Sequence, residues 1–183
     1  MGATSLPGYN TGMDFVLREF RHADFETLWS IDQACFPPGI SYSRPDLAAY
    51  IRRRGSFTLV AESAGGDGNR MKRTDASSVA GFIVAEGGRR DVGHIITIDV
   101  LPVARRRGAG SRLLRAAEER LSAGGCHAVV LETAVDNTAA LAFYKRHHYD
   151  VIRTVPGYYS DGVDAFVLQK DLLSPVQPAN LPR

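Results

Sequence analysis

Two stretches of the chain carry residues whose types and spacing could bind an anion and move protons. The first begins with three consecutive arginines, Arg105, Arg106 and Arg107, which follow the apolar run 95–101 and lead into Gly108-Ala109-Gly110. A strand that runs through a glycine turn into a helix leaves backbone N–H groups pointing outward at the positive end of that helix. Glycines also let the backbone come close to a ligand, because no Cβ stands in the way. The pattern therefore predicts an anion site best suited to phosphate.

The same turn excludes two familiar nucleotide-binding motifs. The dinucleotide pattern GxGxxG needs a third glycine, and none follows Gly110 at that spacing. The P-loop pattern needs a lysine followed by serine or threonine after its second glycine, whereas Ser111 and Arg112 stand here. The alternative to an anion site is a turn whose glycines only permit tight packing.

The second stretch, residues 131–149, places an amide and a phenol on one helical face. Asn137 and Tyr144 are seven positions apart in a predicted helix that spans 136–147. At about 100° per residue this spacing is close to two full turns, so both side chains face the same way. A phenol there could donate a proton to a leaving group. The alternative is that Asn137 only caps the helix and Tyr144 is half-buried core.

A carboxylate interrupts the apolar strand that precedes this helix. Glu132 stands at the carboxyl end of that strand, where α/β sheets place their ligands. It could take a proton from an attacking amine, directly or through water, or it could pair with an arginine for structure. His94, at the start of another predicted strand, is a second candidate base and could equally be a packed or exposed histidine.

The composition indicates one balanced domain. The chain has 183 residues, 44% of them hydrophobic, and its net charge of +2 does not favour nucleic acid as a partner. Cys35 and Cys126 lie far apart and fit no metal spacing, so we expect two reduced thiols in a cytoplasmic protein and no bound metal. We expect no membrane span and no signal peptide.

Periodicity and turn signals predict eleven elements in the order β, α, α, β, β, β, α, β, α, β, β. The predicted strands are 14–20, 56–62, 79–86, 94–101, 127–133, 149–155 and 163–172. The predicted helices are 24–35, 43 or 46 to 53, 108–124 and 136–147. This order predicts a mixed α/β (α+β) domain with a central strand–helix–strand crossover and antiparallel strands around it. We interpret 1–13 as a disordered leader, 63–77 as a surface insertion and 174–183 as a disordered tail.

The turn and the second stretch together resemble the two cofactor motifs of the GCN5-related N-acetyltransferases (GNAT superfamily). In that family, motif A binds the pyrophosphate of acetyl-CoA through backbone amides. In motif B, an asparagine near the helix start contacts the cofactor, and a tyrosine about two turns later is the usual candidate for general acid. Where the family often ends this helix with Gly-Phe, the chain has His148-Tyr149.

The resemblance implies a single GNAT-like domain over 14–173. Its central sheet would be seven-stranded, mixed and mostly antiparallel, with a splayed parallel strand pair and about four helices. It implies that acetyl-CoA is the co-substrate. The implied cofactor-binding residues are Ile98, Asp99, Val100, Arg105, Arg106, Arg107, Gly108, Ala109, Gly110, Ser111, Asn137 and Tyr144.

Two further segments are similar to the ribosomal-protein and protein N-terminal acetyltransferases (RimI-like). They are Cys35-Phe36-Pro37, between the first two helices, and Tyr158-Tyr159, before the last strand. In those enzymes the corresponding loops hold the backbone of the first residues of a polypeptide. The implied acceptor-binding residues are Phe36, Pro37, Tyr42, His94, Tyr158 and Tyr159.

The expected activity is direct transfer of an acetyl group to a primary amine, foremost the N-terminal α-amine of a protein or peptide. Glu132 would act as the base and Tyr144 as the acid, and neither Cys35 nor Cys126 would be a nucleophile. The alternatives are acetylation of a small-molecule amine or a lysine side chain, and a non-catalytic acyl-CoA-binding module. We expect a monomer or a weak dimer that binds neither nucleic acid nor membrane.

Overall fold

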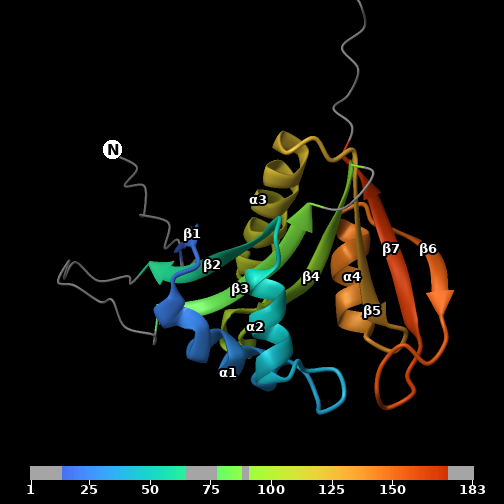
Figure 1. The fold of residues 1–183 in the computed structure, drawn as a ribbon, viewed down its shortest axis with the longest axis horizontal. Coiled ribbons are helices and arrows are strands. Elements are labelled where there is room, and N and C mark those ends of the chain that lie inside the picture. The colour runs from blue at the N-terminus through green and yellow to red at the C-terminus, as the bar shows by residue number, and fades with distance from the viewer. Residues whose placement is uncertain (1–13, 65–77, 88–90, 173–183) are drawn as a thin grey trace, which may run out of the picture.

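The computed structural model describes residues 14–64, 78–87 and 91–172, and their strands form one sheet (Figure 1). Its strand order is β1-β2-β3-β4-β5-β7-β6. The strands are β1 (Asp14–Glu19), β2 (Ser56–Ala64), β3 (Val79–Gly87), β4 (Val92–Val100), β5 (Ala128–Ala134), β6 (Asp150–Val155) and β7 (Ala165–Asp171). The helices are α1 (Phe25–Cys35), α2 (Arg44–Arg52), α3 (Ala109–Ala123) and α4 (Thr138–Arg146), with short 3-10 turns η1 (His22–Asp24) and η4 (Pro102–Ala104). The mixed seven-stranded sheet and the four helices confirm the predicted fold class.

Strands β4 and β5 form the parallel pair of the described sheet, and α3 is the crossover between them. Their register pairs Val92–His94 with Ala128–Val130 and goes no further. Beyond that point β4 stays with β3, while β5 continues alongside β7 (Figure 1). The pairing of β4 with β3 also shifts by one residue at Ile96, a bulge that bends a strand and raises its twist. The sheet therefore forks at His94.

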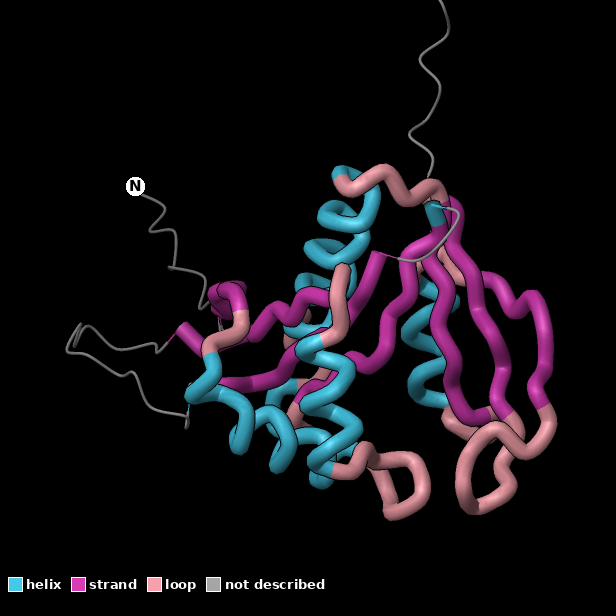
Figure 2. The backbone as a smooth tube through the Cα atoms, viewed as in Figure 1, coloured by secondary structure: helices cyan, strands magenta, loops and turns pink. Residues whose placement is uncertain are grey.

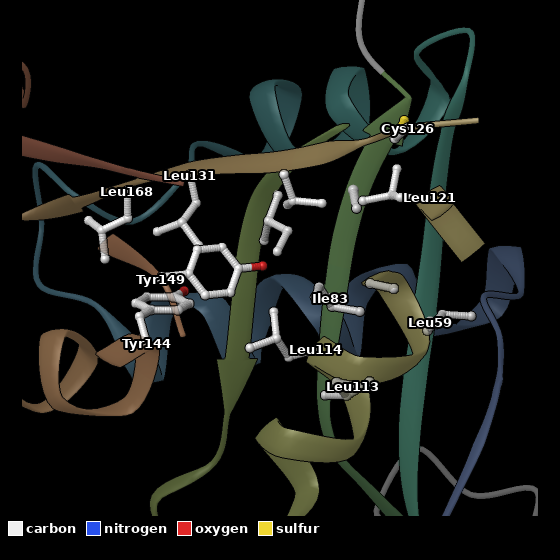
Figure 3. Packing of buried hydrophobic residues seen from close by; sticks show 14 of the residues in the cluster. Leu59, Ile83, Leu113, Leu114, Leu121, Cys126, Leu131, Tyr144, Tyr149 and Leu168 are labelled. Carbon is white, nitrogen blue, oxygen red and sulfur yellow. The ribbon is translucent and has the colours of Figure 1, made fainter. Parts of the chain in front are cut away.

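Apolar clusters cover both faces of the sheet, which explains why β3 is buried along most of its length. On one face, Leu113, Leu114 and Leu121 of α3 pack against the sheet, and the cluster continues to Tyr144 and Tyr149 (Figure 3). On the other face, residues of α1 and α2 pack against β2 and β3, among them Leu28, Ile31, Leu47, Val60 and Phe82. Both faces hold the strands in place, so the fork is supported by packing from α3 and α4 on one side and from α1 on the other.

Most element boundaries agree with the prediction to within two residues. The structure corrects one boundary: Ser63 and Ala64 extend β2, because they pair with Phe15 and Asp14 of β1, and so do not belong to the predicted insertion. Residues 65–77 of that insertion, the predicted leader and the predicted tail lie outside the described residues. Among the described helices, each is too short or too polar to span a bilayer.

Candidate active site

A cavity of about 410 Å³ lies at the fork between β4 and β5. Its walls come from both strands, from the start of α3, from α4 and from two loops, residues 36–43 between α1 and α2 and residues 156–164 between β6 and β7. We call the first the interhelical loop and the second the tyrosine loop. The fork thus brings the anion turn, the predicted acid and base, and both predicted acceptor segments to one cavity.

The anion turn forms one end of the cavity, lined by Arg105, Arg106, Gly108, Gly110 and Ser111. Gly108 is the N-cap of α3 with a φ of 92°, a left-handed conformation that favours glycine, and no side chain caps the helix. A Cβ at Gly108 would meet nothing within 4 Å, so the surface above this residue is open. The first-turn N–H groups of a 15-residue helix therefore remain available to an anion.

Hydrogen bonds orient the cationic and hydroxyl groups at this end. Arg105 donates from Nε to the carbonyl of Val100 at 2.9 Å, which places its guanidinium beside the end of β4. The thiol of Cys35 donates to the same carbonyl at 3.4 Å. Ser111 Oγ and His147 Nε2 lie 2.9 Å apart, so the start of α3 is tied to the end of α4. Burial lowers the pKa of His147, which keeps that imidazole neutral at physiological pH.

Helix α4 contributes Asn137 and Tyr144, and both line the cavity, as the seven-residue spacing predicted. The side-chain oxygen of Asn137 accepts a hydrogen bond from the backbone N–H of Ala140 at 3.1 Å. Its amide oxygen therefore caps the helix, and its NH₂ group remains as a donor. Tyr144 is 6% exposed, and burial raises the pKa of its phenol, so the hydroxyl stays protonated at neutral pH.

The two candidate bases lie face to face across the fork. His94 Nε2 on β4 and Glu132 Oε2 on β5 are 2.7 Å apart, and both side chains are partly exposed to the cavity. The partner of Glu132 is thus a histidine and not the arginine that a purely structural role suggested. A carboxylate hydrogen-bonded to an imidazole can pass a proton along the pair.

The interhelical loop and the tyrosine loop close the other end of the cavity, and they run side by side (Figure 2). Ser160 donates from its hydroxyl to the carbonyl of Gly39 at 3.0 Å, which joins them directly. Tyr42 donates from its phenol to the carbonyl of Ile96 at 3.2 Å, so the first loop is also tied to β4. The rings of Tyr158 and Tyr159 pack edge to face with centroids 5.0 Å apart.

Four of the predicted site residues do not line the cavity: Pro37, Asp99, Arg107 and Ala109. Asp99 is the most informative, because it is 1% exposed and its carboxyl accepts from Thr97 Oγ1 at 2.7 Å. Its neighbours along β4, Ile98 and Val100, do line the cavity. Alternate residues of a strand point to opposite faces, so the side chain of Asp99 points away from the face that carries Ile98 and Val100.

More than a third of the residues that line the cavity were not predicted from the sequence. The missed residues are Ile40, Tyr50, Ile95, Ile96, Thr97, Leu131, Thr133, Ala134, Ala139, Ala140, Phe143 and Arg146. Helical spacing from Asn137 and Tyr144 would have found Ala140, which is three residues from the first and four from the second. Ala139, Phe143 and the cation Arg146 lie on another face of α4, so that spacing does not predict them. Tyr50 carries no such signal, because only the packing of α2 against the sheet brings it to the cavity.

The chain is similar to known proteins in sequence and in fold. The model of the acetyltransferase (GNAT) family matches residues 25–149. An N-alpha-acetyltransferase of Saccharolobus solfataricus is 26% identical over 173 residues, which covers 88% of this chain and 95% of that protein. The structure of Ard1 from Thermoplasma volcanium is similar with a TM-score of 0.74 and 27% identity, over 87% of this chain and 99% of the other. The ribosomal-protein-S18-alanine N-acetyltransferase from Escherichia coli shares the fold at 20% identity, with a TM-score of 0.71 over 93% and 100% of the two chains.

The capping geometry of Asn137 leads to a prediction about stability. Asn137→Ala should lower the free energy of unfolding by about 1 kcal/mol, because the cap bond is lost, whereas Asn137→Asp should leave it unchanged, because a carboxylate caps equally well. Urea unfolding measures both. Ser43→Ala is the matched control, since Ser43 caps α2 by accepting from Asp46 N, and it should lose a similar amount. An Asn137→Asp protein as unstable as Asn137→Ala would contradict the capping role.

Proposed function

The chain belongs to the acetyltransferase (GNAT) family, and we propose that it moves the acetyl group of acetyl-CoA directly to the N-terminal α-amine of a protein or peptide. The observation that carries this proposal is the fork between β4 and β5, which has an anion turn at one end and a carboxylate facing two tyrosine-bearing loops at the other. The N-alpha-acetyltransferase of S. solfataricus, aligned over nearly its whole length, supports this choice of acceptor.

The residues at the turn fit the pyrophosphate of acetyl-CoA. Gly108 presents open space above a left-handed backbone, and the first-turn N–H groups of α3 are uncapped by any side chain. The arginines that line the cavity, Arg105, Arg106 and Arg146, lie at or beside this end. When bound, acetyl-CoA supplies an activated acyl group as a thioester. The edge of β4 beyond His94, no longer paired with β5, offers backbone groups to align the pantetheine arm and to polarise the acyl oxygen.

Glu132 and His94 are the proposed base. A typical α-amino group has a pKa of about 8, so most of the acceptor arrives as ammonium and only the neutral amine attacks. Glu132 accepts the proton directly or through His94, whose ring nitrogen lies within hydrogen-bond distance. Because both groups face the cavity at the fork, the proton is removed next to the site of transfer.

Tyr144 is the proposed acid for the departing thiolate. Its buried phenol keeps its proton at neutral pH, so a proton is available at the end of the reaction. The acceptor loses two protons, one from the ammonium before attack and one from the nitrogen of the tetrahedral intermediate, and Glu132 accepts each in turn. The thiolate takes one proton from Tyr144, which is reprotonated, so each turnover releases one proton to solvent. Direct transfer of this kind requires no covalent enzyme intermediate.

The acceptor half of the cavity favours a cationic amine attached to a peptide. Phe36 provides an apolar wall, and Tyr42, Tyr158 and Tyr159 provide apolar rings with hydroxyl tips, which suit the backbone of a short peptide. Glu132 supplies negative charge, whereas the lining arginines gather near the turn. An ammonium group is thus attracted to one end and an anionic cofactor to the other.

An acceptor panel tests the proposed function. With acetyl-CoA and detection of released thiol, peptides with a free N-terminus should be acetylated. N-terminally blocked peptides that contain lysine, and small amines, should react at least tenfold more slowly. Mass spectrometry should place the acetyl group on the α-amine. Faster turnover of small amines than of any peptide would refute the N-terminal assignment.

The acid and base assignments predict a loss of turnover without a loss of binding. Tyr144→Phe and Glu132→Gln should each lower kcat by about 10²-fold, the usual scale for a general acid or base, and change the Kd for acetyl-CoA by less than about twofold. Stopped-flow or steady-state rates, together with calorimetry, separate the two effects. Full activity of either variant would remove that residue from the mechanism.

The turn predicts a selective loss of cofactor affinity. Gly108→Val should raise the Kd for acetyl-CoA by about tenfold or more, because a side chain then stands over the anion site in a strained backbone. Gly125→Val is the matched control: Gly125 has the same φ of 92° and the same open space, but follows the far end of α3. Both variants should lose stability, and only the first should lose affinity. Equal affinities by calorimetry would argue against phosphate binding at the turn.

A further inference from the structure

Asp32 on α1 is a buried carboxyl that the proposed chemistry does not use. It is 0% exposed and forms no salt bridge with any of the described residues. Most buried carboxylates, by contrast, pair with a cation. Oδ2 accepts two hydrogen bonds, and Oδ1 has no partner among the described residues. Burying a carboxylate without a cation is costly in free energy, so an apolar residue at this position would stabilise the helix packing better.

Both hydrogen bonds of Asp32 lead to the interhelical loop. The backbone N–H of Tyr42 donates to Oδ2 at 2.9 Å, and Gln33 Nε2 donates to the same oxygen at 2.9 Å. Gln33 Nε2 also lies 2.9 Å from the carbonyl oxygen of Tyr42 and donates to it. The peptide groups on both sides of Tyr42 are therefore held by two adjacent residues of α1.

The held residue is the one that shapes the acceptor end of the cavity. The hydroxyl of Tyr42 reaches the carbonyl of Ile96 at the bulge of β4, and its ring packs edge to face on Tyr50 with centroids 5.1 Å apart. Tyr42 and Tyr50 both line the cavity. Further along the loop, Gly39 is joined to Ser160 of the tyrosine loop. A shift of the Tyr42 backbone would thus move the wall that faces the acceptor.

We propose that Asp32 is a positioning residue: it holds the interhelical loop through the backbone N–H of Tyr42 and so sets the affinity for the acceptor's first residues. This inference rests on the proposed function for its kinetic consequence, although the contact itself does not. Asp32 touches neither the anion turn nor the His94–Glu132 pair among its hydrogen bonds. Its loss should therefore weaken acceptor binding and leave cofactor binding intact.

The charge on Asp32 strengthens this contact. A carboxylate accepts a stronger hydrogen bond from a backbone N–H than a neutral group does. The titratable groups around it are Cys35 on α1, Tyr42 on the loop, Asp99 on β4 and, beyond Asp99, Arg105. Burial first, and also the neighbouring Asp32, raises the pKa of Asp99.

The protonation of Asp32 falls in an accessible pH range. Burial raises the pKa of Asp32 from its ordinary value of 3.8 to about 6. Because the folded pKa is raised, the folded state binds more protons than the unfolded state between these values, and stability falls as the pH rises through that window. Asp32→Asn removes this loss, so it should be no less stable than the wild type at pH 8. If Asp32 served only to stabilise the fold, Asp32→Asn would instead be less stable than the wild type at pH 8.

Steady-state kinetics with a free N-terminal peptide test the proposal. At pH 8, Asp32→Ala should raise the peptide KM by about tenfold, the loss expected for one charge-assisted hydrogen bond, with kcat and the Kd for acetyl-CoA changed by less than about twofold. Asp32→Asn keeps one oxygen for Tyr42 N and should recover part of the loss. The KM difference between wild type and Asp32→Asn should shrink below pH 6, where Asp32 is protonated.

Asp24→Asn is the matched control, because Asp24 stands at the N-cap of the same helix and pairs with Arg18 at 2.7 Å, away from the loop. It should lower stability and leave the peptide KM unchanged. An unchanged KM in Asp32→Ala, an equal rise in the Kd for acetyl-CoA, or the same KM rise in Asp24→Asn would each overturn the proposal.

Hydrogen exchange of the Tyr42 amide tests the contact without any acceptor. The amide should exchange at least tenfold faster in Asp32→Asn than in the wild type at pH 8, and equal exchange would overturn the proposal. If the wild type acetylates no peptide, the proposed function fails while faster exchange still supports the contact. If Asp32→Ala does not fold, Asp32→Asn carries both measurements.

Discussion

The parting of β4 and β5 is the constraint on which the rest of the site depends. Parallel strands joined by a crossover helix are expected to pair along their whole length, yet here the register ends at His94 and Val130. The bulge at Ile96 bends β4, which stays paired with β3, and β5 remains fully paired with β7. Each strand therefore has a full set of partners on its outer side, and the inner edges are left facing a cavity. Without that opening, the anion turn and the His94–Glu132 pair would be separated by ordinary sheet.

The two ends of the cavity are built by different physical means. At the turn, binding capacity comes from the backbone: an uncapped helix start, a left-handed glycine and neighbouring arginines. At the acceptor end, it comes from loops whose conformation depends on side-chain hydrogen bonds, such as Ser160 with Gly39 and Asp32 with Tyr42 N. A helix terminus is positioned by its whole helix, whereas a loop is positioned by a few contacts. Differences in acceptor among enzymes with one fold are thus most easily made at the loop end.

The buried polar groups follow the same division. Glu118 on α3 accepts from Tyr149 and pairs with Lys170, so its charge is compensated and it holds α3 to the strands beyond the fork. Asp32 has no such cation among the described residues, and it accepts a hydrogen bond from the backbone of the interhelical loop instead. The paired charge of Glu118 costs the fold little stability, whereas the unpaired charge of Asp32 lowers it next to the acceptor loop. Stability is thus reduced near the site and maintained elsewhere.

Local sequence pattern was enough to predict the helices and strands and about half of the residues that line the site. The apolar run before Arg105, the two glycines and the spacing of Asn137 and Tyr144 depend only on strand, turn and helix geometry, and all of these are local. Local pattern did not determine which way the side chain of Asp99 points, because strand register decides which neighbours face the cavity, and register is set by pairing with β3. The pairing of His94 with Glu132 joins residues from two strands that only the sheet brings together.

The sequence by itself determined the order of elements, the anion turn and the shared face of α4, because each is encoded within one or two turns or one strand. Only the tertiary structure decided where β4 and β5 part, that Glu132 meets His94 there, and that Tyr50 and Arg146 reach the cavity. It also decided that Asp32 on α1 accepts a hydrogen bond from the backbone N–H of Tyr42 in the interhelical loop. Those contacts depend on the packing of separate elements against one sheet, and no local pattern specifies that packing.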